Sequence, residues 1–248
     1  PGLVQATDVN GNLVADQTTA NGGYYRFDNL LTGDYVVEIR SSNFTAPGML
    51  TGCVSSTGGN DPDTDVDDSD DNGLGIQPDP TNGIRSAPVT LGPGVGTEPT
   101  GDNDPATNPA VGEAPDNQSN RTVDFGFVPV YSLGNRVWKD TDNSGTINGV
   151  ETGVNGVVVR LLNAAGNQAT DVNGNLVADQ TTTGGGYYRF DNLLAGDYTV
   201  EVRASNFTAP GILTGCVSST GGNDPDTDVD DSDDNGLGIQ PDPSNGIR

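Results

Sequence analysis

The chain has 248 residues, enough for one large or two ordinary domains, and carries 35 acidic against 10 basic residues, a formal net charge of -25. Because this charge repels phosphate groups, the composition excludes nucleic acids and anionic membrane surfaces as partners and favours divalent cations. The absence of histidine removes the commonest general base, and no apolar run approaches the roughly 18 residues of a transmembrane helix, so membrane insertion of this segment is not expected.

The first predicted elements are short strands joined by glycine-rich turns. An Asn-Gly turn at Asn10 and Gly11 precedes an aromatic strand over residues 24–30. The connection "LLTGDY" is short enough to predict a hairpin to a strand over residues 34–40. Side chains of this strand should alternate between two faces: Tyr35, Val37 and Ile39 are expected inward, and Val36, Glu38 and Arg40 outward.

A dense acidic run, "NDPDTDVDDSDDNGLG", follows within a wide loop over residues 58–75 and recurs in a loop over residues 221–238. Its carboxylates repel one another by roughly a few kcal/mol unless they are screened or bridged. Two interpretations remain open, a solvated loop and a loop ordered by additional calcium ions. The tentative ligands are Asp61, Asp63, Asp65, Asp67, Asp68, Asp70 and Asp71 in the first run, and Asp224, Asp226, Asp228, Asp230, Asp231, Asp233 and Asp234 in the second.

A Pro/Gly-rich insert over residues 86–120 comes next, and residues 87–91 within it predict one more strand. The insert is long for a structureless loop, so we expect it to lie against the sandwich or a neighbouring unit. The segment "TVDFGF", residues 122–127, predicts the last strand of this unit, with Val123, Phe125 and Phe127 alternating with Thr122, Asp124 and Gly126. A very short junction to the next strand predicts restricted motion between units and a semi-rigid array.

The stretch "DTDNSGTINGVE", residues 140–151, has the spacing of an EF-hand-type calcium loop. Such a loop places oxygen ligands at positions 1, 3, 5, 7, 9 and 12 and glycine at position 6. The predicted ligands are Asp140, Asp142, Ser144, Thr146 through its backbone carbonyl, Asn148 and Glu151. Alternate residues of a tight loop point at a common centre, so the sequence predicts calcium as the cofactor. The alternative is an acidic turn without an ion. Because the predicted flanks are strands, only the loop chemistry matches an EF-hand.

The remaining segment predicts a further strand and then repeats the start of the chain. Residues 157–163 should place Val157, Val159 and Leu161 inward and Arg160 outward. Residues 168–248 match residues 5–85 at a constant offset of 163, with eight differences over 81 positions. The chain therefore reads as about one and a half copies of a 163-residue repeat within a tandem array. We assign residues 1–130 to the C-terminal part of one repeat and residues 131–248 to the N-terminal part of the next.

Each repeat carries one cysteine, Cys53 and Cys216, at equivalent positions. Because the repeat offers no second cysteine as a partner, we consider an intermolecular disulfide and a free thiol. Carboxylates are abundant, but an acid catalyst would need an apolar pocket to raise the pKa of one of them. The apolar residues are committed to thin cores, so no catalytic activity is expected. Short strands, glycine-rich turns and the missing helical period predict an all-β sandwich.

Three stretches together resemble a known family: "YSLGNRVWKDTDNSGTINGVETGVNGVVVRLLN", "GGYYRFDNLLAGDYTVEV" and "TVDFGF". They are similar to the B-type repeats of serine-aspartate repeat (Sdr) surface proteins, which belong to the Cna-B-like, prealbumin-like sandwich group. The resemblance implies tandem Ig-like or prealbumin-like β-sandwich domains, calcium in the loop over residues 140–151, and a secreted, extracellular module at a microbial cell surface. It also implies that the module has no catalytic activity.

These observations lead to three hypotheses of function. The first is a structural repeat of an extracellular stalk or filament, stiffened by calcium and self-assembling with neighbouring copies of the same repeat. The second is a repeated adhesin module that binds a host or neighbouring-cell ligand through its inserted loops. The third is the noncatalytic part of a secreted enzyme.

Overall fold

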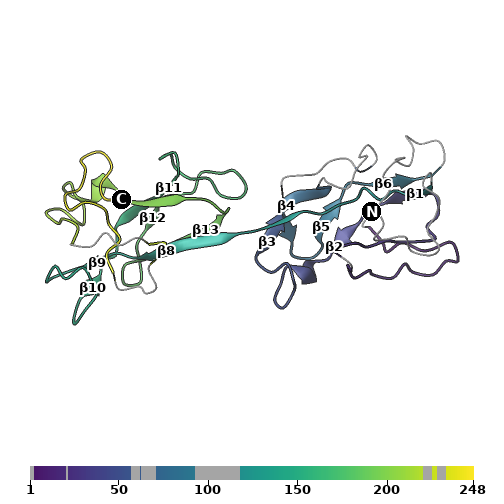
Figure 1. Ribbon diagram of the computed structural model, residues 1–248, viewed down its shortest axis with the longest axis horizontal. Coiled ribbons are helices and arrows are strands. Elements are labelled where there is room, and N and C mark those ends of the chain that lie inside the picture. The colour runs from purple at the N-terminus through teal and green to yellow at the C-terminus, as the bar shows by residue number, and fades with distance from the viewer. Residues whose placement is uncertain are drawn as a thin grey trace. The chain divides into compact units, whose positions relative to one another are not determined.

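The computed structural model describes residues 3–20, 22–56, 62, 71–92, 118–219, 225–227 and 233–248. The chain divides into two compact units, Pro1–Pro129 and Val130–Arg248 (Figure 1). Over the described residues, regular structure consists of β-strands and short 3₁₀ turns without an α-helix. The predicted all-β class is therefore confirmed.

The first unit contains short antiparallel strands whose apolar side chains Val54, Ile84 and Val89 are buried. Two strand pairs are β1 (Gly33–Tyr35) with β6 (Val89–Leu91), and β3 (Cys53–Ser55) with β7 (Phe127–Pro129). A three-stranded sheet places β5 (Gly83–Ser86) between β2 (Glu38–Ile39) and β4 (Gly73–Asp79). Strand β6 confirms the element predicted over residues 87–91.

The second unit is also built from antiparallel sheets (Figure 1). Strand β8 (Tyr131–Arg136) pairs with β13 (Tyr187–Leu193), and β9 (Trp138–Lys139) pairs with β10 (Thr152–Gly153). Strand β11 (Val158–Asn163) lies between β12 (Gln180–Thr181) and β14 (Tyr198–Val202).

The core of the second unit lies between the sheets that contain β11 and β13. Val157, Val159 and Leu161 have no exposed surface and belong to one cluster with Phe190 and Leu193 of β13. Burying side chains of this size stabilises the fold by about 1.5–3 kcal/mol each. The inward positions predicted for Val157, Val159 and Leu161 are confirmed, although the neighbouring Leu162 is also buried. The apolar faces of the two sheets meet and form a sandwich.

The hairpin predicted at "LLTGDY" and "LLAGDY" is wrong. In the second unit β13 pairs with β8, whereas β14 pairs with β11, so the connection carries the chain from one sheet to another. In the first unit β1 begins inside "LLTGDY" and pairs with β6. A hairpin within one sheet and a connection between two packed sheets can both be made by a few residues. The length of "LLAGDY" therefore does not distinguish them.

Two other strand predictions need correction. Residues 24–30 form no strand, although their copy at 187–193 is β13. The partner of β13 is β8, and the counterpart of β8 at an offset of 163 falls outside the sequence. Strand β7 begins only at Phe127, so residues 122–126 of the predicted strand lie outside it. Thr122 is fully buried, and its hydroxyl donates a hydrogen bond to Asn120 at 3.0 Å.

The outward position predicted for Glu38 does not extend to its copy in β14, because Glu201 is only 4% exposed. Its carboxylate forms ion pairs with the guanidinium groups of Arg203 at 3.3 Å and Arg248 at 3.0 Å. A bridge between Val202 and Ile247 brings the Arg248 segment beside β14. This segment covers the face that alternation alone assigns to solvent.

Candidate metal centre

The loop over residues 140–151 is held at both ends by paired strands. Strand β9 immediately precedes Asp140, Thr152 of β10 immediately follows Glu151, and the two strands pair through Thr152 with Lys139. Inside the loop Gly145 has φ +77°, in the left-handed region that glycine adopts without steric cost. The expected glycine at the sixth position therefore makes the sharp turn.

Asp140 organises the first half of this loop. Its Oδ1 accepts hydrogen bonds from the backbone N–H groups of residues 142–144 at 2.6–3.3 Å, and its Oδ2 accepts one from Gly145 at 2.9 Å. Desolvation raises the pKa of the Asp140 carboxyl, but these backbone donors outweigh it and hold the pKa below the usual value of 3.8. The carboxylate is therefore ionised at neutral pH.

The predicted ligands in the middle of the loop are connected through Ser144. Its hydroxyl donates to the carbonyl oxygen of Thr146 at 3.0 Å and accepts from the amide nitrogen of Asn148 at 2.9 Å. The same amide nitrogen donates to Oδ2 of Asp142 at 3.2 Å. These contacts bring oxygen atoms of the third, fifth and seventh positions into one cluster.

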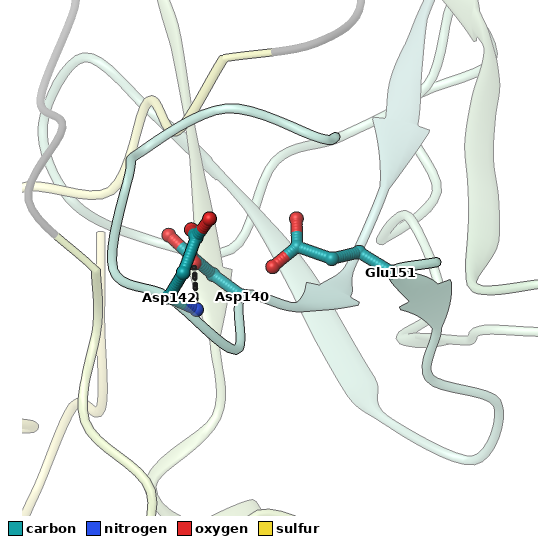
Figure 2. Close-up of side chains that lie close together, drawn as sticks. All are labelled: Asp140, Asp142 and Glu151. Carbon is teal, nitrogen blue, oxygen red and sulfur yellow. Dashed lines mark hydrogen bonds between the residues drawn. The ribbon is translucent and has the colours of Figure 1, made fainter. Parts of the chain in front are cut away.

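Glu151 closes the loop from the opposite side. Its Oε1 accepts hydrogen bonds from the backbone N–H and hydroxyl of Thr141, and its Oε2 accepts one from the backbone of Asn148 at 3.2 Å. Figure 2 shows its carboxylate pointing across the loop toward Asp140 and Asp142.

The three carboxylates fit a hard divalent cation. Each of Asp140, Asp142 and Glu151 offers an oxygen that lies within 4.8 Å of the others. Calcium takes six to eight oxygen ligands at about 2.3–2.6 Å from carboxylates, carbonyls and water, which is the chemistry of this donor set. The loop therefore gathers the oxygen donors that a hard divalent cation prefers, and its side chains include no nucleophile paired with a base.

The end of the second acidic run lies beside this loop. Asp233 forms an isolated antiparallel bridge with Thr146, and the backbone N–H of Asp234 donates to the carbonyl of Gly145 at 2.9 Å. The carboxylate of Asp234 accepts from the hydroxyls of Ser218 and Ser219 at 3.2 and 2.9 Å. Sequence reasoning missed these contacts, because they join segments far apart in the chain.

The other tentative ligands belong to the first unit, to an exposed turn of the second unit or to segments outside the described residues. Asp71 is 9% exposed and accepts hydrogen bonds from Ser55 and Ser56, and Asp226 is exposed in a turn. The ligands outside the described residues are Asp61, Asp63, Asp65, Asp67, Asp68, Asp70, Asp224, Asp228, Asp230 and Asp231. Calcium binding by the acidic runs stays a prediction.

Cys53 and Cys216 are both partly buried, and neither forms a disulfide within the chain. An intermolecular disulfide through either thiol stays a prediction. No helix among the described residues is long and apolar enough to cross a membrane.

Comparison with known proteins identifies the family. Residues 131–247 match the family model of the SdrD B-like domain. The chain is 35% identical over 196 residues to serine-aspartate repeat-containing protein I of Staphylococcus saprophyticus, covering 78% of this chain and 8% of that protein. It is 31% identical over 227 residues to serine-aspartate repeat-containing protein E of Staphylococcus aureus strain Mu50, covering 91% of this chain and 15% of that protein.

A third relative is serine-aspartate repeat-containing protein F of Staphylococcus epidermidis strain ATCC 12228, 28% identical over 281 residues, or 84% of this chain and 17% of that protein. The chain thus spans only 8–17% of the length of these relatives. No solved structure matches. The sandwich, the repeat and these similarities agree. Residues 131–247 form an SdrD B-like domain, which is an Sdr B-type domain of an extracellular, cell-surface repeat module.

Proposed function

We propose that the chain is a calcium-stiffened structural repeat of an extracellular stalk or filament. The observation that carries the proposal is the convergence of the Asp140, Asp142 and Glu151 carboxylates in a loop pinned between β9 and β10. Calcium would take these carboxylates together with Ser144 and the carbonyl of Thr146, and Asn148 would bind it through water.

The ion stabilises the domain by linkage, because the unfolded chain does not hold the ligands together. Binding to the folded form alone contributes about 2.7 kcal/mol when free calcium is a hundredfold above the dissociation constant. The loop follows β8 and β9, which begin the second unit, and Val130 is the single residue between β7 and β8. Ordering the loop therefore orders the residues that follow the junction, which supports the stiffening proposal.

Self-assembly with neighbouring copies is the second part of the proposal. The two copies of the repeated segment differ at only eight of 81 positions, so successive units present nearly the same surfaces. Arrays of equivalent surfaces favour regular association, since each additional contact is made at high effective concentration.

Calorimetry and fluorescence test the calcium site on the 248-residue chain. Trp138 is the only tryptophan and lies two residues before Asp140, so its emission should report calcium binding. Because the loop belongs to the second unit, millimolar calcium should raise the unfolding midpoint of that unit and leave the first unaffected, relative to a chelator. The variant Asp140→Asn/Glu151→Gln should lose both responses.

The outcomes separate the hypotheses. If one ion binds and the unfolding midpoint of the first unit does not change, calcium is assigned to the loop over residues 140–151 alone. If more than one ion binds per unit, the acidic run also binds calcium. If no calcium binds and the midpoint stays constant, the loop is only a turn and the adhesin hypothesis takes precedence.

A further inference from the structure

The backbone of residues 233–234 pairs with the outer side of the loop over residues 140–151. Residues 145–146 pair with it, so the Gly145 carbonyl points outward to the N–H of Asp234 at 2.9 Å. In extended backbone successive carbonyls point in opposite directions. The next carbonyl, that of Thr146, therefore points into the loop, where it accepts the Ser144 hydroxyl at 3.0 Å. The outer pairing thus sets the direction of a proposed calcium ligand.

The Asp234 side chain anchors this outer segment. Its Oδ2 accepts from the hydroxyls of Ser218 and Ser219, and its Oδ1 accepts from the backbone of Gly236 at 3.0 Å. With both oxygens engaged by protein donors, the carboxylate is held in a fixed position. The N–H that reaches Gly145 belongs to the same residue and is fixed with it.

The first unit contains the same anchor. Asp71 accepts from Ser55 at 3.2 Å, from Ser56 at 2.6 Å and from the backbone of Gly73 at 2.9 Å. The counterpart of residues 140–151 at an offset of 163 falls outside the sequence. The anchor is therefore a property of the repeat itself, and the chain supplies one copy with the loop and one copy without it.

We propose that Asp234 is a positioning residue of the calcium loop, acting through the Gly145 carbonyl to aim the Thr146 carbonyl at the ion. This inference rests on the proposed calcium function. It explains how calcium binding and the attachment of residues 233–234, at the end of the acidic run, stabilise each other. By reciprocity, calcium strengthens the attachment of residues 233–234 as much as that attachment strengthens calcium binding. Asp234 is thereby assigned a structural role rather than that of a ligand.

The test compares serine pairs that touch none of the ligands proposed in the loop over residues 140–151. In the 248-residue chain, Ser218→Ala/Ser219→Ala removes the hydroxyl donors to Asp234, and Ser55→Ala/Ser56→Ala removes the same donors to Asp71. Calcium affinity and stoichiometry are measured by titration calorimetry, with Trp138 fluorescence as a second readout. Loss of groups that orient metal ligands weakens affinity by about 10–100-fold. The second-unit pair should weaken calcium binding by at least about tenfold at unchanged stoichiometry, and the first-unit pair should leave it unchanged.

Two further variants separate positioning from general loss of structure and from direct ligation. Ser218→Thr/Ser219→Thr keeps both hydroxyls and should retain the affinity of the original chain. Asp234→Asn should weaken binding without removing an ion, whereas loss of one ion from the stoichiometry would make Asp234 a ligand and overturn the inference. Unchanged affinity in Ser218→Ala/Ser219→Ala would overturn the inference alone, while absence of calcium binding by the unmodified chain would overturn the proposed function as well.

Discussion

Asp191 shows how one carboxylate joins two strands of the second unit. It lies in β13, and its Oδ1 accepts a hydrogen bond from the hydroxyl of Ser132 in β8 at 2.6 Å, while its Oδ2 accepts one from Nε of Arg189 at 3.0 Å. The Ser132 hydrogen bond is the main cause that lowers the pKa of Asp191 below 3.8, opposed by desolvation and assisted by Arg189. The ionised form is therefore favoured by folding.

The sign of the pH dependence follows from this lowered pKa. A carboxyl whose pKa is depressed in the folded state stabilises the protein above its unfolded pKa, and the stabilisation disappears as the pH falls through the folded pKa. We expect Asp191→Asn to lower the unfolding midpoint of the second unit at pH 7, and the difference from the unmodified chain to vanish well below pH 3.8. Thermal unfolding as a function of pH measures this difference.

Ser132→Ala is the matched control for this prediction, because it removes the main cause of the shift and leaves the carboxyl in place. The unfolding midpoint of Ser132→Ala should therefore fall less on acidification than that of the unmodified chain. A difference between Asp191→Asn and the unmodified chain that stays constant from pH 7 to pH 3 would contradict the assigned cause.

Strand β14 differs from the expected pattern because its glutamate is held by two arginines. Glu201 bonds Arg203 within its own segment and Arg248, which lies 47 residues further along the chain. In the first unit the counterpart, Glu38, pairs with Arg85 at 2.7 Å and keeps 31% of its side chain exposed. The same sequence pattern thus gives an ion pair with a buried carboxylate in one unit and a partly exposed ion pair in the other.

We predict that Glu201→Ala destabilises the second unit more than Glu38→Ala destabilises the first. The Glu201 change removes the acceptor of two arginines at a buried position and should cost roughly 1–3 kcal/mol. A half-exposed ion pair contributes about 0–1 kcal/mol, so the Glu38 change should be small. Denaturant unfolding that resolves the two units measures both costs, and equal losses would contradict the importance of burial.

Local patterns predicted those parts of the structure that depend on neighbouring residues. The inward set Val157, Val159 and Leu161 followed from strand alternation, and the converging carboxylates of residues 140–151 followed from ligand spacing within a single loop. The route of the chain between sheets, the burial of Glu201 and the contact of Asp234 with Gly145 all depend on partners distant in sequence. Composition and periodicity carry no information about such partners, so these features required the structure.

The charge of the whole chain bears on how copies of it associate. A formal net charge of -25 makes copies repel one another, and this repulsion extends over a screening length of about 8 Å at physiological ionic strength. Sodium ions screen this repulsion without linking the carboxylates of two chains. Calcium can accept oxygen ligands from more than one segment, so it both lowers the charge and can join copies.

We therefore predict that association of the 248-residue chain depends on calcium rather than on ionic strength. Sedimentation velocity should find monomers in the presence of a chelator and larger species in millimolar calcium, with sodium chloride of equal ionic strength as the control. Equal association in both salts would mean that screening alone drives it. Monomers under every condition, despite calcium binding by the loop, would separate the two parts of the proposed function, because the ion would then stiffen each unit without joining copies.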